Sequence, residues 1–337
     1  MGFYRTFRAR AARAGLHRPV GWLRNFGLDS SDLLLASYGR SGNSMLRFIL
    51  AEILSGVPAT FETIQRIVPE IGLQFRTYPT LAGNGRLIKT HEPYCREYNR
   101  AIYIVRDVRD VLLSGYQRET AVGSLSMNLD DYIRPFMEGK MAHWGSWQSH
   151  AESWINSPLA RNGNLLVIRY EDMRKDPERA VRRSLEFLGR TAEASVIEAA
   201  IRNNSLQQMR DKEQRSKLMK IEGDGRQING GIIGRWSTAL TPRQLEIVHV
   251  YAGEMLGHFG YPADDGAEYT KQLIPEDVNQ PLCDSAAMAQ PSRSFLSVRP
   301  QQFSPIDLES KTHPAANRAL RIRVGGRIAN LFSWYPY

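Results

Sequence analysis

Short runs of apolar residues, each ending in a group of polar residues, recur along the middle of the chain. Such runs cover residues 32–38, 101–105 and 165–170. Hydrophobicity that is continuous rather than alternating over so few residues is typical of a strand covered on both faces, as in a parallel sheet. We therefore predict three buried strands.

Segments with apolar residues at helical spacing follow these runs. After the first run, the helical pattern continues from Met45 until Gly56 ends it. Asp176 and Thr241 are each followed by proline, which predicts an N-cap and a first helical residue. The other predicted helices cover residues 108–117, 177–188, 192–203 and 242–257. This alternation predicts a three-layer α/β fold with a central, mainly parallel sheet.

Two basic extensions flank the predicted α/β domain, which we place at residues 30–264. Residues 1–29 form a basic arm with six arginines and no acid before Asp29. The arm is interpreted either as an amphipathic helix that contacts an anionic membrane or as a solvated arm without a dedicated partner, and its composition also suits a transit peptide. Residues 265–337 are rich in proline, which predicts a mostly irregular C-terminal extension that ends in a basic stretch.

Composition and charge narrow the function classes. Hydrophobic residues make up 42% of the 337 residues, which excludes a wholly disordered chain. No apolar run approaches the ~18 residues of a membrane-spanning helix. The cysteines, Cys95 and Cys283, lie too far apart in sequence for a zinc ribbon or a disulfide scaffold, so we expect a reducing, cytoplasmic compartment. The 44 Lys and Arg exceed the 35 Asp and Glu by nine, which indicates an anionic partner.

The junction between the first strand and the first helix has the residues of a phosphate-binding loop. Gly39 and Gly42 free the backbone to curl, so that N–H groups point inward beside the positive end of the helix dipole. Arg40 adds a permanent charge, and the side chains that can donate hydrogen bonds are Ser41, Asn43 and Ser44. Because Asn43 stands where a Walker A motif has lysine, the loop is P-loop-like without being a Walker A motif.

Three further segments carry candidate chemistry. Arg106 follows the second strand, at the sheet edge where open α/β folds bind ligands, and Ser114 lies two turns into the next helix. Lys89 and His91 lie two residues apart after a short apolar stretch, where they suit anion binding and proton transfer. Residues 229–236 form a glycine-rich loop that either closes over a ligand or simply connects two elements.

In order and spacing, these residues resemble the sulfotransferases that use 3′-phosphoadenosine 5′-phosphosulfate (PAPS). The resemblance covers about residues 30–262. Residues 38–44 are similar to the family's Y-P-K-S-G-T-T loop, 89–93 to K-T-H-L-P, 106–114 to R-N-x-K-D-V-x-V-S, 170–172 to Y-E-D, 205–209 to S-F-K-E-M and 231–236 to G-x-x-G-D-W.

The resemblance implies sulfuryl transfer from PAPS, as co-substrate, to a hydroxyl acceptor. It makes His91 the general base, while Lys89 and Arg40 would stabilise charge on the sulfuryl group and on the leaving phosphate. No metal ion is expected, because clustered cations can stabilise these charges without one. No nucleic-acid partner is expected either. The residues expected to bind the cofactor are Arg40, Ser41, Gly42, Asn43, Ser44, Met45, Arg106, Ser114, Tyr170, Ser205, Leu206 and Gly231.

Several positions depart from the family pattern. Gly39 and Arg40 replace Pro and Lys of the first loop, and Met45 and Leu206 replace two aromatic residues at the adenine. The family's R-K-G is Asn-Gly-Gly at residues 229–231, which removes two phosphate-binding cations, for which Arg226 is a candidate substitute. These changes bear on cofactor affinity more than on the class of reaction.

Two alternative functions stay open at this stage: a nucleotide kinase of P-loop type, and a non-catalytic protein that binds anions or a membrane surface on the same fold. The missing Walker lysine disfavours the kinase. The acceptor is also open, as a glycan, a lipid or a small natural product, and so is the oligomeric state. We expect the acceptor to meet loops at about residues 58–84 and 119–145, and the enzyme to act in the cytoplasm, with membrane association at its cytoplasmic face left open.

Overall fold

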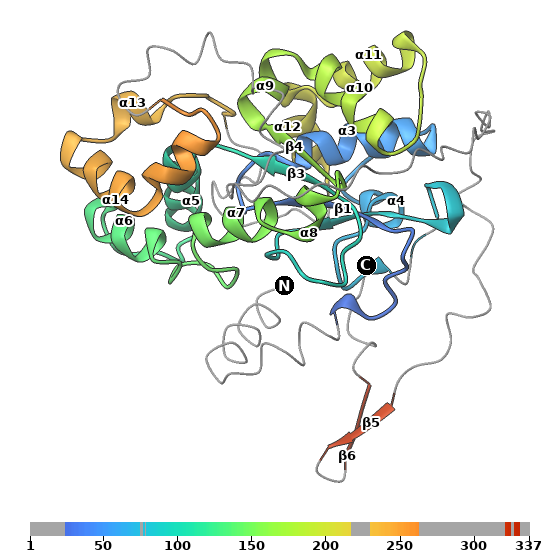
Figure 1. The fold of residues 1–337 in the computed structure, drawn as a ribbon, viewed down its shortest axis with the longest axis horizontal. Helices are drawn as coiled ribbons and strands as arrows, with labels where there is room; N and C mark the ends of the chain where they lie inside the picture. Colours follow the sequence, from blue (N-terminus) through green and yellow to red (C-terminus); the bar gives the residue numbers. More distant parts are fainter. Residues whose placement is uncertain are drawn as a thin grey trace, which may run out of the picture.

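A four-stranded parallel sheet forms the centre of the molecule (Figure 1). The computed structural model describes residues 24–74, 77, 79–216 and 230–262, and the backbone of 321–324 and 327–330. The strands are β1 (Leu33–Ser37), β2 (Leu87–Thr90), β3 (Ala101–Val105) and β4 (Leu165–Arg169), in the spatial order β2-β1-β3-β4. All three strand pairs are parallel, so the predicted α/β fold is confirmed.

Alternate residues of the strands enter two separate hydrophobic cores, one on each face of the sheet. Leu34 and Ala36 lie in the first core with Tyr103, whereas Leu33 and Leu35 lie in the second. Every residue of the four strands is buried. This is why the strands show continuous rather than alternating hydrophobicity in the sequence.

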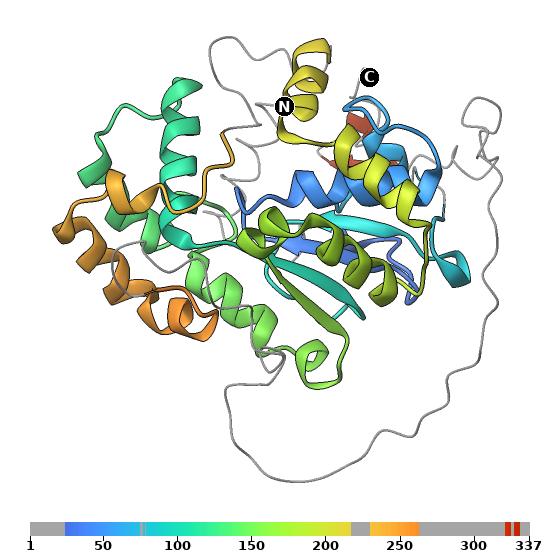
Figure 2. The same ribbon diagram turned by 90° about the horizontal axis from the view of Figure 1, so that it is seen from above.

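Helices cover both faces of the sheet, as the views in Figures 1 and 2 show. The first core is closed by α5 (Val108–Ala121), α6 (Leu129–Met137), α7 (Trp147–Ile155), α8 (Pro158–Arg161), α13 (Trp236–Ala239) and α14 (Pro242–His258). The second is closed by α3 (Asn43–Ser55), α4 (Ile64–Ile67), α9 (Tyr170–Lys175), α10 (Pro177–Phe187), α11 (Ala194–Asn203) and α12 (Leu206–Arg215). A short 3₁₀ helix, η2 (Ala82–Asn84), precedes β2.

The helix starts agree with the caps predicted from the sequence. The side chain of Asp176 accepts a hydrogen bond from the backbone N–H of Arg179, and Pro177 is the first residue of α10. Thr241 and Gln244 form a complete capping box at the start of α14. Both arrangements satisfy backbone N–H groups that a helix start leaves without partners.

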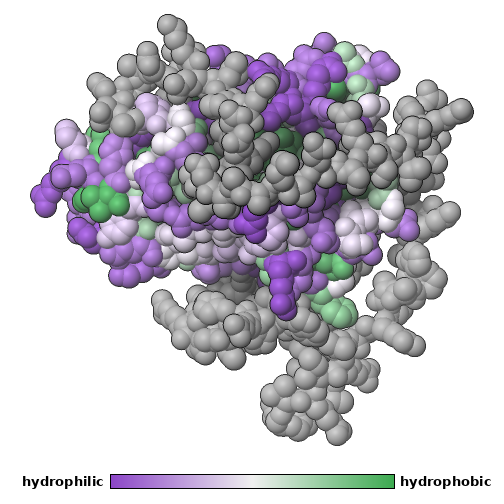
Figure 3. Space-filling view, viewed as in Figure 1, coloured by the Kyte–Doolittle hydropathy of each residue, from purple (hydrophilic) through white to green (hydrophobic). Residues whose placement is uncertain are grey.

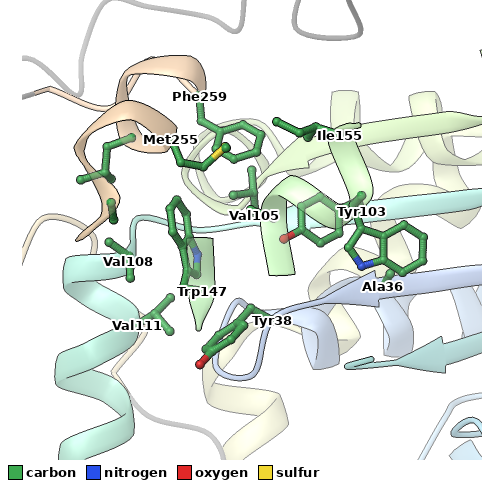
Figure 4. Packing of buried hydrophobic residues seen from close by; sticks show 14 of the residues in the cluster. Ala36, Tyr38, Tyr103, Val105, Val108, Val111, Trp147, Ile155, Met255 and Phe259 are labelled. Carbon is green, nitrogen blue, oxygen red and sulfur yellow. The ribbon is translucent and has the colours of Figure 1, made fainter. Parts of the chain in front are cut away.

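Aromatic residues fill the first core where α5, α7 and α14 meet the sheet. In Figure 4, Trp147 lies close to Val111 of α5 and to Tyr38, with Met255 of α14 and Phe259, which directly follows that helix, near its ring. The Trp147 and Phe259 rings pack edge-to-face with centroids 6.1 Å apart. This packing fixes the end of β1, where the phosphate-binding loop begins.

Three features differ from the sequence-based expectations. Helices α4 and α6 lie inside the two segments that we expected to be substrate loops. In the second segment, residues 129–137 form an amphipathic helix that packs against α14. Tyr170 begins α9 rather than ending β4. Arg24 is buried and pairs with Glu92, so this last arginine of the basic arm belongs to the folded domain.

Most of the two predicted extensions lies outside the described residues. This applies to residues 1–23 of the basic arm and to nearly all of the C-terminal extension. Within the latter, β5 (Arg321–Val324) and β6 (Arg327–Asn330) pair antiparallel. The described residues on the face seen in Figure 3 are mainly hydrophilic, with apolar groups in small, separate patches. Over the described part of the chain, no helix has the length and apolarity needed to span a membrane.

Candidate active site

The loop between β1 and α3 curls through two residues with positive φ. Arg40 has φ of 69° and Gly42 has φ of 86°. A Cβ atom at Gly42 would collide with the ring of Tyr170, so only glycine allows α9 to approach the loop this closely. The N–H groups of the first residues of α3 have no acceptor within the helix and carry the positive end of its dipole. The loop therefore has the backbone geometry of an anion site.

Gly39, which stands where the family pattern has proline, lies directly against the ring of Trp144. A Cβ atom at Gly39 would lie 2.7 Å from Cζ2 of Trp144. The Trp144 ring also packs edge-to-face on Tyr38, with centroids 5.9 Å apart, and lies 5.5 Å from the imidazole of His91. Trp144, which sequence reasoning did not identify, thus forms a wall between the loop and His91.

The two hydroxyls and the amide of the loop differ in what they contact. Ser41 is buried, and its Oγ has no hydrogen-bond partner among the described residues. Asn43 is turned inward: its Nδ2 donates to the Leu35 carbonyl at 3.0 Å and to Ser37 Oγ at 3.2 Å. The Asn43 side chain therefore holds the loop against β1, and its backbone N–H stays at the helix start. Ser44 is half-buried at the second position of α3.

Arg40 and Ser114 are in direct contact. Nε of Arg40 donates to Oγ of Ser114 at 3.0 Å. Burial, together with repulsion from the Arg118 and Arg106 charges, lowers the pKa of Arg40 to about 10. The guanidinium is still charged at neutral pH, and an anion among these cations would relieve their repulsion.

Arg106 connects the first loop with the glycine-rich loop. Its guanidinium donates to the backbone carbonyls of Arg40 at 3.3 Å and Ile232 at 2.9 Å. It also lies over the Tyr170 ring, 4.5 Å from the centroid, and 3.5 Å from Oδ2 of Asp110. The predicted cofactor residues Arg106 and Tyr170 therefore occupy one place, at the carboxyl ends of β3 and β4.

Asp110 anchors the start of the closing segment. Its two carboxylate oxygens accept from the backbone N–H groups of Gly234 at 2.9 Å and Trp236 at 3.2 Å. Burial raises the pKa of Asp110, while the Arg106 charge opposes that rise. Sequence reasoning missed this role, although the residue lies one helical turn after Arg106.

The imidazole of His91 has a defined tautomer. Its Nδ1 lies 2.8 Å from the carbonyl oxygen of Ser37 and 3.2 Å from the hydroxyl of the same residue. Since a carbonyl oxygen can only accept, Nδ1 carries the proton and Nε2 holds a free lone pair. Burial and the Lys89 charge lower the pKa of His91 to about 3, so the ring is neutral at physiological pH.

A second histidine holds the backbone of the first. The Nε2 atom of His150 lies 3.2 Å from the His91 carbonyl oxygen, and its Nδ1 lies 3.1 Å from the Tyr103 hydroxyl. His150 is completely buried on α7, and burial lowers its pKa to about 4. It is a positioning residue, and its sequence neighbourhood gives no signal of that role.

Lys89 is nearly buried at the end of β2 and has an acidic partner. Its Nζ lies 3.3 Å from Oε2 of Glu70, whose backbone bridges to β2 at the same residue. Burial lowers the pKa of Lys89, and Glu70 opposes that shift. Glu70 was not identified from the sequence, because the pairing joins two segments that only the sheet brings together.

The other predicted cofactor residues lie on α3, α12 and the glycine-rich loop. Met45 packs against the second core. Ser205 caps α12 by accepting from the N–H of Gln208, and Leu206 is the first residue of that helix. Gly231 has φ of 60° and approaches Tyr170. Arg226, the candidate substitute cation, lies outside the described residues.

Within the described residues, no group of three or more His, Cys, Asp or Glu side chains could hold a metal ion. The site is instead rich in cations, from Arg40 to Arg106 and Lys89. Such a set suits an anionic ligand with more than one phosphate-like group.

Comparisons with known proteins identify the family. Residues 30–260 match the model of the sulfotransferase domain. Sulfotransferase 2A1 of Rattus norvegicus is 29% identical over 239 residues, covering 66% of this chain and 83% of the relative. Sulfotransferase 1A1 of Bos taurus is 26% identical over 264 residues, covering 71% and 88%.

Solved structures share the fold. Retinol dehydratase in complex with androsterone and the inactive cofactor PAP superposes with a TM-score of 0.57 at 19% identity, covering 70% of this chain and 83% of that one. A mouse sulfotransferase complexed with PAP gives 0.55 at 21% identity, covering 70% and 87%. The chain belongs to the sulfotransferase domain family. The sulfotransferase class of enzyme expected from the sequence is thereby confirmed.

Proposed function

We propose that this sulfotransferase moves the sulfuryl group of PAPS to a hydroxyl acceptor, with His91 as general base. One observation carries the assignment of the base: the His91 Nδ1–H is held by the Ser37 carbonyl, which leaves Nε2 as the only proton acceptor of the ring. Nε2 has no hydrogen-bond partner among the described residues, and a pKa near 3 keeps its lone pair free of a proton.

The proposed reaction is an in-line displacement at sulfur. The acceptor oxygen forms a bond to sulfur, the bond from sulfur to the bridging phosphate oxygen breaks, and the acceptor proton passes to His91 Nε2. Arg40 is proposed to stabilise the charge that grows on the leaving phosphate oxygen. The Arg40–Ser114 hydrogen bond places the guanidinium beside the first loop, where the α3 N–H groups would bind the same phosphate.

Lys89 is proposed to stabilise the equatorial oxygens of the sulfuryl group. Its pairing with Glu70 limits its movement and keeps the ammonium close to its place at the end of β2. At the other end of the cofactor, Arg106 and Ser114 are proposed to bind the 3′-phosphate and Tyr170 to lie beside the nucleoside. Met45 and Leu206 would pack on the adenine, and Ser205 and Gly231 would border it.

The acceptor is proposed to enter beside His91 and Trp144. The solved relative retinol dehydratase is described with androsterone and with retinol, both hydroxylated lipids or lipid-like molecules. The classes open for this chain are a glycan, a lipid and a small natural product. The aromatic wall formed by Trp144 beside His91 favours an acceptor with an apolar body next to its hydroxyl.

The test is transfer of sulfur-35 from labelled PAPS to a panel of sterols, retinoids, phenols and sugars, without magnesium. We expect labelled product with at least one acceptor and release of one PAP for each. Phosphoryl transfer from ATP that requires magnesium would support the kinase alternative instead. Tight binding of PAP with no transfer to any acceptor would support the non-catalytic alternative.

Location and membrane contact form a separate proposal about the basic arm. Cytoplasmic action, with peripheral contact to anionic lipid, would use the five arginines of residues 1–23, which lie outside the described residues. Arg24 does not take part, since it is buried against Glu92. The proposal is independent of the catalytic assignment.

A further inference from the structure

Two arginines from different helices approach Gly230 and Gly231 of the Asn-Gly-Gly segment that stands in place of the family's R-K-G. Arg174 lies on α9 and Arg210 on α12. A Cβ atom at Gly231 would lie 3.0 Å from Nη1 of Arg174, and one at Gly230 would lie 4.0 Å from Nη2 of Arg210. The segment that lost two cations from its own sequence thus has two cations beside it in space.

Both arginines are left without protein partners in the part of the chain that the structure describes. Neither forms an ion pair or a hydrogen bond with a described residue, and Nε of Arg210 is buried without an acceptor. Buried polar groups are normally hydrogen-bonded, so the buried Nε of Arg210 favours a ligand that can accept from it, and the half-buried Arg174 is placed to contact the same ligand.

A third guanidinium lies at the same loop. Arg106 reaches the same loop through its hydrogen bond to the Ile232 carbonyl. The acid closest to it, Asp110, already accepts from the N–H groups of Gly234 and Trp236 as well as facing Arg106. One carboxylate so engaged does not neutralise three guanidinium groups, whereas a phosphate dianion would bring two negative charges.

We propose that Arg174 and Arg210 bind the 3′-phosphate of the nucleotide together with Arg106, in place of the two missing cations. This inference rests on the proposed function, since it assumes that the ligand is PAPS. Gly231 is part of the arrangement: its positive φ and the closeness of its Cβ position to Arg174 and Tyr170 leave no room for a side chain there.

Calorimetric titrations with PAP and with adenosine 5′-monophosphate, which lacks the 3′-phosphate, test the proposal. Arg174→Gln and Arg210→Gln should each weaken PAP binding by roughly ten-fold or more, the effect of losing one charge-assisted hydrogen bond. Binding of the monophosphate should not change. Arg202→Gln is the matched control, because Arg202 lies exposed on α11, where it pairs with Glu198. This variant should bind both nucleotides as the unaltered protein does.

A lysine introduced at Gly230 distinguishes a binding role of Arg210 from a structural one. Gly230→Lys restores the family's own cation, and in the Arg210→Gln background it should recover most of the lost PAP affinity. Unchanged PAP affinity in both glutamine variants, or equal losses for the two nucleotides, would overturn the proposal. Failure of the lysine to restore binding would overturn the assignment of Arg210. If the unaltered protein itself does not prefer PAP, the proposed function fails rather than this inference.

Discussion

Nδ1 of His91 lies 2.8 Å from the carbonyl oxygen of Ser37, which joins the end of β2 to the end of β1. The contact fixes the ring, assigns its proton to Nδ1 and leaves the lone pair of Nε2 free, as the proposed base requires. Ser37 directly precedes the phosphate-binding loop, so the base and the sulfuryl donor would be held by the same short segment of backbone.

Gly42→Ala should abolish nucleotide binding and destabilise the protein, because the new methyl group would collide with Tyr170 in addition to straining a positive φ. Gly56→Ala is the matched control: Gly56 also has positive φ, at the other end of α3, and no atom lies within 4 Å of its Cβ position. The control variant should lose only the stability that backbone strain removes, ~1–2 kcal/mol, and should keep its PAP affinity. Thermal unfolding and calorimetry measure both effects, and equal losses in the two variants would contradict the role of the close approach.

Arg106→Ala should erase the preference for PAP over adenosine 5′-monophosphate, since one charge-assisted contact contributes ~1.5–3 kcal/mol. The comparison of two nucleotides within one variant removes general effects on folding, which are expected because Arg106 also contacts the Ile232 carbonyl and Asp110. A preference that survives the substitution would show that the 3′-phosphate lies elsewhere.

His150 should make stability depend on pH. Burial lowers its native pKa from 6.5 to about 4, so the unfolded chain binds more protons between these values. Its contribution to stability is therefore complete above pH 6.5 and is lost as pH falls toward 4. His150→Gln, which can still donate to the His91 carbonyl, should flatten this dependence by up to about 1.4 kcal/mol per pH unit. Urea unfolding at pH 7, 6 and 5 measures it, and parallel curves would refute the assignment.

Removal of residues 1–23 should leave PAP affinity unchanged and reduce binding to anionic vesicles. The five arginines removed would each contribute roughly 1 kcal/mol at a charged membrane surface. Sedimentation with phosphatidylserine vesicles at low and high salt is the measurement. The cut spares Arg24, whose pairing with Glu92 belongs to the fold. Absence of salt-sensitive binding by the full chain would rule out the membrane role.

The sequence was sufficient to predict three of the four strands, because strands with both faces covered leave continuous apolar runs. The short strand β2 was not predicted as a strand. Nor was the sequence sufficient for α6. Leu129, Tyr132, Ile133 and Phe136 recur at helical spacing after the N-cap Asn128, but this signal lies in a segment interpreted as a substrate loop. The pattern was present and was outweighed by the expectation of a loop.

The partners of the site residues could not be predicted in the same way. Glu70 and His150 reach Lys89 and His91 from segments whose relation to β2 exists only in the folded chain. The inward turn of Asn43 and the packing of Trp144 on Gly39 are also tertiary facts. Charge and spacing indicate which residues face a ligand, whereas tautomers and pKa values depend on burial.

The pKa of His91 changes one expectation about rate. An ordinary imidazole, with a pKa near 6.5, would give kcat/KM an acidic limb in the physiological range. Burial moves the pKa to about 3, so Nε2 stays unprotonated and His91 adds no limb between pH 5 and 8. A limb centred near pH 6.5 that disappears on substitution of His91 would show that the ring becomes more exposed in the working enzyme.

The most direct test of the account is the turnover of His91→Asn with saturating PAPS and an acceptor found in the sulfur-35 screen. Asparagine can still donate to the Ser37 carbonyl, but it has no atom equivalent to the basic Nε2. We predict that PAP affinity is retained while kcat falls by roughly 10²–10⁴, the usual contribution of a positioned general base. Turnover close to that of the unaltered enzyme would contradict the assignment of His91 as the base.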